Sequence, residues 1–207
     1  MKQNLTPYLL LFFLSTTAAG EVAGVFSAEG FEIHLARVNG REEKVAEVLV
    51  GLSQKHDLSP WLFTDHVRIE SGVIPHSHPI LTLNTRHIEN STQLLAVFLH
   101  EQIHRFLAAP ENRNQLEDAL SELREMYAKV PDSLAGGAAS ENSTYLHLLV
   151  NWLEYDALVK LMGRSEAQEA IEEKDIYEWI YGKVLQDTLQ LESIVVQNNL
   201  RIFHERR

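Results

Sequence analysis

The stretch LLAVFLHEQIHRFL, residues 94–107, decides how the chain must fold, because it is apolar almost throughout yet holds two histidines and a glutamate. Asn90 in front of it is typical of a helix start, and Pro110 behind it is typical of a helix end. On a helix, His100 and His104 leave the same face about one turn apart. A helix that is apolar on nearly every side is buried, so its polar side chains need partners.

A zinc ion would satisfy the two histidines and the glutamate of this stretch together. Neutral imidazole nitrogens of His100 and His104 would coordinate it, and Glu101 would accept a proton from a water on the open coordination position. Residues 100–104 thus form the H-E-x-x-H pattern of zinc hydrolases. The alternative is a core helix in which both histidines bond to backbone groups beside a surface glutamate.

A catalytic zinc site needs a third protein ligand. The compact pattern with a third histidine three residues after a glycine is excluded, because Pro110 occupies that histidine position. Residues 145–157 offer another source, since His147, Asn151 and Glu154 form one polar stripe on an otherwise apolar helix. We expect Glu154 as the third ligand, with His147 or another carboxylate as alternatives. If it is not a ligand, His147 would orient the ligands or stabilise an oxyanion.

Two further pairs of side chains have the spacing of a site. Tyr177 and Tyr181 are one turn apart, and we expect Tyr181 to stabilise an oxyanion, although two aromatic residues at this spacing are also typical of a core. His76 and His78 could share one strand face and bind a second ion, but a surface loop is the simpler interpretation.

The HEQIH motif followed by a helix that holds Glu154 resembles the gluzincin branch of the zinc metallopeptidases, the thermolysin-like clan. The resemblance covers roughly residues 75–160. It implies a minimal zincin-like domain with Zn²⁺ on His100, His104 and Glu154, and a peptide or protein substrate bound as an added strand by residues 79–85. The chain is also similar to small exported bacterial proteins of unknown function.

Composition limits the classes of protein to which the chain can belong. It has 207 residues, of which 45% are hydrophobic and 23% charged, as is typical of one globular domain with a core. The formal net charge of −11 disfavours nucleic acid and anionic membrane surfaces as partners. The absence of cysteine excludes disulfides, a cysteine nucleophile and thiolate metal ligands. No apolar run reaches the roughly 18 residues of a membrane-spanning helix.

The N-terminus carries a targeting pattern. Lys2 is the only charged side chain before Glu21, and an apolar run over residues 8–14 precedes small residues that suit cleavage. We expect residues 1–20 to be a signal peptide and residues 21–207 to form a single exported domain, periplasmic or extracellular. The alternative is a frayed apolar helix. Loss of Lys2 with the leader would change the net charge from −11 to −12.

Hydrophobic spacing predicts an α+β fold, with a small N-terminal sheet packed on a helical C-terminal half. Strands are expected within residues 31–37, 61–70 and 80–84. Besides the motif helix, helices are expected at residues 41–55, 116–129, 140–161 and 174–197, with a linker over residues 163–168.

These patterns together favour a zinc-dependent peptidase in which Glu101 is the general base and His147 or Tyr181 stabilises the oxyanion. Two alternatives remain open at the level of sequence. One is a binding module whose zinc is not catalytic, and the other is a zinc hydrolase of a different amide or an ester.

Overall fold

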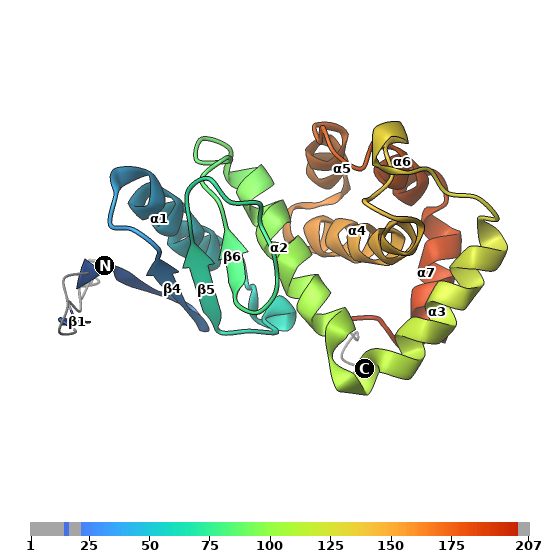
Figure 1. Ribbon diagram of the computed structural model, residues 1–207, viewed down its shortest axis with the longest axis horizontal. Helices are drawn as coiled ribbons and strands as arrows, with labels where there is room; N and C mark the ends of the chain where they lie inside the picture. The colour runs from blue at the N-terminus through green and yellow to red at the C-terminus, as the bar shows by residue number, and fades with distance from the viewer. Residues whose placement is uncertain (1–14, 17–21, 203–207) are drawn as a thin grey trace, which may run out of the picture.

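The computed structural model describes residues 15–16 and 22–202. The expected signal peptide, residues 1–20, therefore lies outside the described residues except for β1 (Ser15–Thr16), which pairs with β2 (Val22–Ala23). A small sheet stands beside a larger group of helices (Figure 1), which confirms the predicted α+β fold.

The main sheet has four strands in the order β3-β4-β5-β6. β3 (Val25–Ala28) is antiparallel to β4 (Phe31–Leu35), whereas β5 (His66–Ile69) and β6 (Leu81–Leu83) continue it in parallel. α1 (Gly40–Lys55) connects β4 to β5 and packs against both. Side chains alternate along β4, so that its buried residues face one side while Glu32 and His34 face the other.

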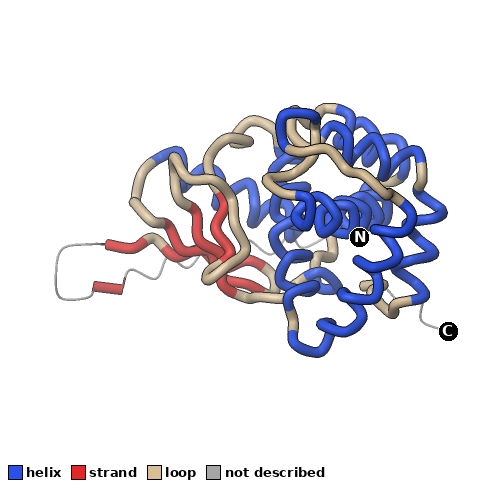
Figure 2. The backbone as a smooth tube through the Cα atoms, turned by 45° about the vertical axis from the view of Figure 1, so that its right-hand side comes forward, coloured by secondary structure: helices blue, strands red, loops and turns tan. Residues whose placement is uncertain are grey.

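Six helices follow the sheet, and Figure 2 shows how they group on one side of it. They are α2 (Ser91–Ala108), α3 (Arg113–Met126), α4 (Glu141–Met162), α5 (Arg164–Glu172), α6 (Glu178–Gln186) and α7 (Thr188–Gln197). Short 3-10 turns lie at Ser59–Trp61, Pro110–Asn112 and Ser133–Ala135. Within the described part of the chain, no helix is both long and apolar enough to cross a membrane.

α2 joins the two halves, because it contacts α1 and β6 on one side and α4 and α5 on the other. Its start is capped as expected, since the Asn90 side chain accepts a hydrogen bond from the Gln93 backbone N–H at 3.1 Å. The fully buried Gln102 fixes α2 against the chain before β5. Its Oε1 accepts from the backbone N–H groups of Phe63 and Thr64 at 2.8 and 3.0 Å.

Two details of the C-terminal half differ from the prediction. The segment expected to be a linker, residues 163–168, is instead mostly helical, because α5 begins at Arg164. α4 ends just before Gly163, which has a φ of 91°. The expected long last helix is two helices that meet at Asp187. Asp187 accepts a hydrogen bond from the Tyr127 hydroxyl at 2.7 Å, and the Thr188 carbonyl accepts one from Trp152 Nε1 at 3.1 Å. Both partners come from distant segments, so hydrophobic spacing could not reveal the break.

Candidate metal centre

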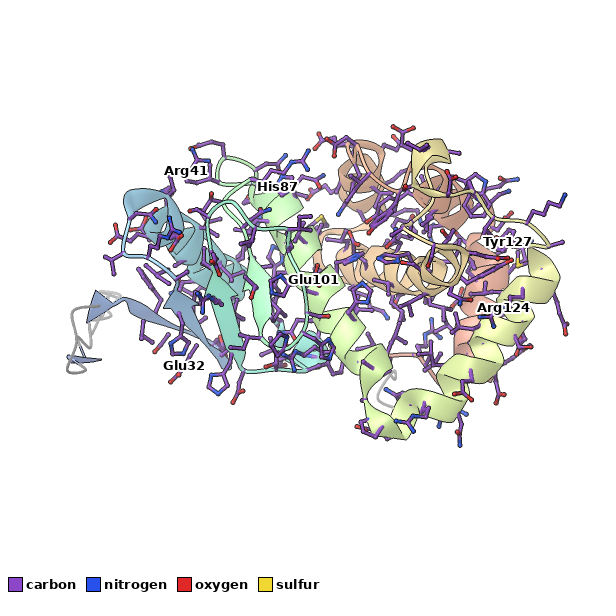
Figure 3. The ribbon with its side chains drawn as sticks, in the orientation of Figure 1. Glu32, Arg41, His87, Glu101, Arg124 and Tyr127 are labelled. Atoms are coloured by element: carbon purple, nitrogen blue, oxygen red, sulfur yellow. The ribbon has the colours of Figure 1, made fainter. Side chains whose placement is uncertain are left out.

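Three histidine rings converge where α2 faces α4. His100 and His104 come from α2, and their Nε2 atoms lie 3.2 Å apart. His147 comes from α4, and its ring centroid is 5.5 Å from that of His100 and 5.0 Å from that of His104. One nitrogen from each ring lies within 4.8 Å of the other two, so this group could hold a metal ion. Figure 3 labels Glu101 on α2 in this region.

The hydrogen bonds of two rings determine which nitrogen faces the centre. His100 Nδ1 lies 2.9 Å from Glu154 Oε2, and a carboxylate can only accept, so Nδ1 carries the proton. His147 Nδ1 lies 2.7 Å from the Ser143 carbonyl oxygen, which also only accepts. In the neutral ring, Nε2 of each histidine then carries the lone pair, and that of His100 lies within hydrogen-bond distance of His104 Nε2. Metal-bound histidines are commonly anchored in this way through the other nitrogen.

Burial keeps the imidazoles of His104 and His147 uncharged. Desolvation first, and the neighbouring His100 second, lower the pKa of His104 to about 2 and that of His147 to about 4. Both rings are therefore neutral at pH 7, which is the form that binds a metal.

Glu154, expected as the third ligand, lies behind His100 on the side of its Nδ1 atom. It is fully buried, and its Oε2 accepts hydrogen bonds from His100 and from the Tyr181 hydroxyl at 2.9 and 2.8 Å. Its Oε1 forms an ion pair with Lys174 Nζ at 2.8 Å. Burial acts to raise the pKa of Glu154, but Lys174 and His100 outweigh it and lower that pKa to about 2.

This arrangement changes the order of the expected ligands. The carboxylate of Glu154 is bound by the side chains of His100, Tyr181 and Lys174. His147, by contrast, lies close enough to the two motif histidines to share a metal ion with them. The geometry therefore favours His147, the sequence-based alternative, as the third ligand. Tyr181, expected to face an oxyanion, instead directs its hydroxyl to Glu154.

A pocket of about 300 Å³ opens beside the three histidines. Glu101 and Tyr177 line it together with residues 75–78, which come from the loop before β6. The candidate pair His76 and His78 thus lies in a loop at the pocket rather than on a strand.

Glu101 is placed to exchange protons in this pocket. Its side chain belongs to the pocket wall, yet the residue is only 6% exposed. Burial raises the pKa of the Glu101 carboxyl, and His100 and His76 only partly oppose this effect. A carboxyl group with a raised pKa can take up a proton near neutral pH and give it back.

Tyr177 supplies the phenol that faces the pocket. Its ring centroid lies 4.5 Å from that of His147 and 6.2 Å from that of His100, almost parallel to the latter. Burial raises its pKa, and Glu101 and Glu154 add to the effect, so the hydroxyl keeps its proton. The sequence offered both tyrosines but gave no reason to choose Tyr177 over Tyr181.

The strand before the motif is less open than the resemblance implied. The outward backbone groups of Thr82 in β6 are paired with His76, through N···O distances of 2.8 and 3.0 Å. A peptide therefore cannot add to β6 at Thr82 unless this pairing opens.

Several residues of the site were not found by sequence reasoning. Lys174, which neutralises Glu154, and Ser143, which anchors His147, occur in ordinary polar segments without a motif.

Asn151, the middle residue of the polar stripe, is fully buried, and its amide atoms have no hydrogen-bond partner among the described residues.

Comparisons with protein-family models, with curated proteins and with solved structures gave no match.

Proposed function

We propose that this protein is a zinc-dependent hydrolase that cleaves peptide bonds, with Zn²⁺ held by His100, His104 and His147. The distance of 3.2 Å between His100 Nε2 and His104 Nε2 carries the proposal. Zinc–nitrogen bonds of about 2.0–2.1 Å in a tetrahedron place neighbouring ligand atoms about 3.4 Å apart. Because Nδ1 of His100 and of His147 already donates a hydrogen bond, the donor set fits the metal.

The reaction divides between the metal and the residues around it. Bound Zn²⁺ would supply a Lewis acid that polarises the scissile carbonyl and lowers the pKa of a bound water to about 7. Glu101 takes a proton from the attacking water as its oxygen bonds to the carbonyl carbon. Glu101 then gives that proton to the amine nitrogen as the C–N bond breaks. The raised pKa of Glu101 suits both steps.

Tyr177 is the donor for the charge that develops on the carbonyl oxygen. Its protonated phenol lines the pocket and packs against two of the proposed ligands. Such a donor acts most strongly in a site that excludes water. Glu154 and Ser143 hold the rings of His100 and His147 in position, and Lys174 and Tyr181 hold Glu154 in turn.

Peptides are favoured over esters because of the second proton transfer. An amine is a poor leaving group unless it is protonated, whereas an alkoxide leaves more readily. A buried carboxyl that accepts and then returns a proton is what amide cleavage requires.

The ligand set is tested by the zinc content of purified variants, measured by elemental analysis. We expect His104→Ala and His147→Ala each to remove about one ion per chain. Glu154→Gln should keep this ion but bind it roughly 10–100-fold more weakly, as befits an anchoring residue. If Glu154→Gln removes the ion and His147→Ala keeps it, the assignment of the ligands is reversed.

The reaction is tested with Glu101→Gln on a peptide library. We expect hydrolysis to be abolished while zinc stays bound, because the amide cannot take the proton. Glu117→Gln, an exposed glutamate of α3, is the matched control and should be fully active. Zinc binding without turnover of any substrate would indicate a binding module. Cleavage of esters or amidated sugars, but not of peptides, would indicate a different hydrolase.

A further inference from the structure

We propose a second metal site on the outer face of the sheet, formed by Glu32, His34 and His66, that binds Zn²⁺ or a similar divalent transition metal. The proposal does not depend on the first centre, because its residues come from β4 and β5 rather than from α2 and α4. Figure 3 labels Glu32 on the sheet, well apart from Glu101.

The register of the sheet brings the three side chains together. Glu32 and His66 are direct partners across the parallel pair β4–β5, and His34 lies two residues farther along β4 on the same face. Their neighbours in the chain, Ile33 and Val67, are fully buried on the opposite face. The three potential ligands therefore project together from the side that α1 does not cover.

The distances fit one ion. His34 Nε2 lies 3.5 Å from Glu32 Oε2, close to the roughly 3.4 Å between ligand atoms of tetrahedral zinc. One ligand atom from each of Glu32, His34 and His66 lies within 4.8 Å of the other two. The side chains are 44–63% exposed, so small rotations about their χ angles can close the larger separations.

A fourth potential ligand atom, a carboxylate oxygen, lies beside the group. Asp65 Oδ1 lies 3.6 Å from His66 Nε2. The Asp65 carbonyl accepts the Glu32 backbone N–H at 2.7 Å, which fixes the start of β5 beside β4. Arg68, the partner of His34 across the parallel pair, forms an ion pair with Glu70 at 3.0 Å, so its charge is compensated.

The chemistry of the donors selects the ion. Two imidazoles with one or two carboxylates suit zinc, copper and nickel, whereas calcium and magnesium prefer oxygen ligands alone. An ion on this face would join β4 to β5, and so hold together the sheet that carries the loop before β6 and, through it, one wall of the pocket.

The test is calorimetric titration of the full chain with Zn²⁺. We expect about two ions per chain, and about one after His34→Gln with His66→Gln. The matched control, His56→Gln with His87→Gln, also removes two histidines and should leave both ions bound. Circular dichroism verifies that each variant is folded, which surface substitutions should permit.

A second background separates this site from the pocket. In a chain that carries His100→Gln and His104→Gln, one Zn²⁺ should still bind, and adding His34→Gln and His66→Gln should weaken that binding at least about tenfold. Binding that is unchanged by this addition, or lost equally with His56→Gln and His87→Gln, would overturn the proposal. Neither result would bear on the proposed hydrolase, whose ligands are absent from this background.

Discussion

Tyr177 has an unfavourable backbone conformation at the edge of the pocket. Its φ of 59° and ψ of 32° lie in the left-handed region, which costs a bulky residue roughly 1–2 kcal/mol relative to ordinary helical geometry. Such a cost is tolerated where the surrounding structure holds the residue for a purpose. In this conformation the Tyr177 ring packs against those of His147 and His100.

Tyr177→Phe tests this role at the level of one hydroxyl group. The substitution keeps the ring packing and removes the donor, so we expect kcat to fall about 10²–10³-fold with zinc content unchanged. Steady-state kinetics on a cleaved peptide provide the measurement. Tyr155→Phe, on α4, is the control and should keep its kcat. A rise in KM alone would show that Tyr177 binds the substrate without stabilising the transition state.

Glu42 provides a second prediction at the residue scale, on stability rather than activity. It is fully buried at the start of α1, and it accepts hydrogen bonds from the backbone N–H groups of Arg37 and Ser71 at 2.7 and 2.8 Å. Burial acts to raise its pKa, but these hydrogen bonds outweigh burial and lower the pKa below 4.5. The ionised carboxylate therefore stabilises the folded chain.

The sign of the pH dependence follows from the lowered pKa. The stabilisation from Glu42 is fully present above about pH 4.5, and it is lost as the pH falls through the lower folded-state pKa. We expect Glu42→Gln to reduce the free energy of unfolding at pH 7 by about 1–3 kcal/mol. Urea titrations should show that this difference shrinks in acid. A difference that stays constant down to pH 3 would mean that the charge of Glu42 contributes nothing.

At the residue scale, the sequence identified the motif, but it ranked the candidate third ligands in the reverse of the order that the geometry favours. His100 and Glu101 are buried and His104 is partly buried, as an apolar helix implied, and all three line the same pocket. His147 and Glu154 share one stripe of α4, and we expected Glu154 rather than His147 as the third ligand, although their spacing alone does not separate them. Only the packed structure reveals that Lys174 and Tyr181 bind the carboxylate oxygens of Glu154.

At the scale of elements, the chain joins α4 to the start of α6 through a buried ion pair. Lys174, in the connection between α5 and α6, reaches Glu154 in α4, and their side chains are only 6% and 0% exposed. Breaking such a pair from one side leaves an uncompensated buried charge. The pair therefore ties the connection that leads to Tyr177 to the helix that carries His147.

We expect Lys174→Met to lower the free energy of unfolding by about 3–5 kcal/mol, because Glu154 is then buried without a counter-charge. Adding Glu154→Gln should recover much of this loss, and chemical denaturation of both variants measures the recovery. Lys44→Met removes one partner of an exposed ion pair on α1 and should cost about 0–1 kcal/mol. An equal loss in the two single variants would show that the buried pair has no special weight.

Element boundaries were predictable where the signal was local. Asn90 caps α2 as expected, and Ser140 caps α4 in the same way, because a side-chain oxygen in front of an apolar run is a signal in the sequence itself. β3 was not predicted, since its four residues become a strand only by pairing with β4. The division between α6 and α7 likewise depends on Tyr127 and Trp152, far away in the chain.

At the scale of the whole molecule, the candidate metal centre depends on the packing of α2 against α4. The unfolded chain does not hold His147 near the two motif histidines, so a metal ion that bridges them binds mainly the folded state. Metal binding then adds to the free energy of unfolding according to mass action. The size of this gain reports whether the three rings act as one site.

We expect Zn²⁺ at about 100 times its dissociation constant to raise the free energy of unfolding by about 2.7 kcal/mol. For a chain of this size, that gain corresponds to roughly 5–10 °C in Tm. Scanning calorimetry with Zn²⁺ and with a chelator measures it, in a chain carrying His34→Gln and His66→Gln so that the sheet does not contribute. His147→Ala should lose most of the shift, because it removes the only expected ligand outside α2, whereas His56→Ala should keep it. If His147→Ala retained the full shift, zinc would stabilise the fold from elsewhere, and α2 and α4 would be packed together without a shared metal.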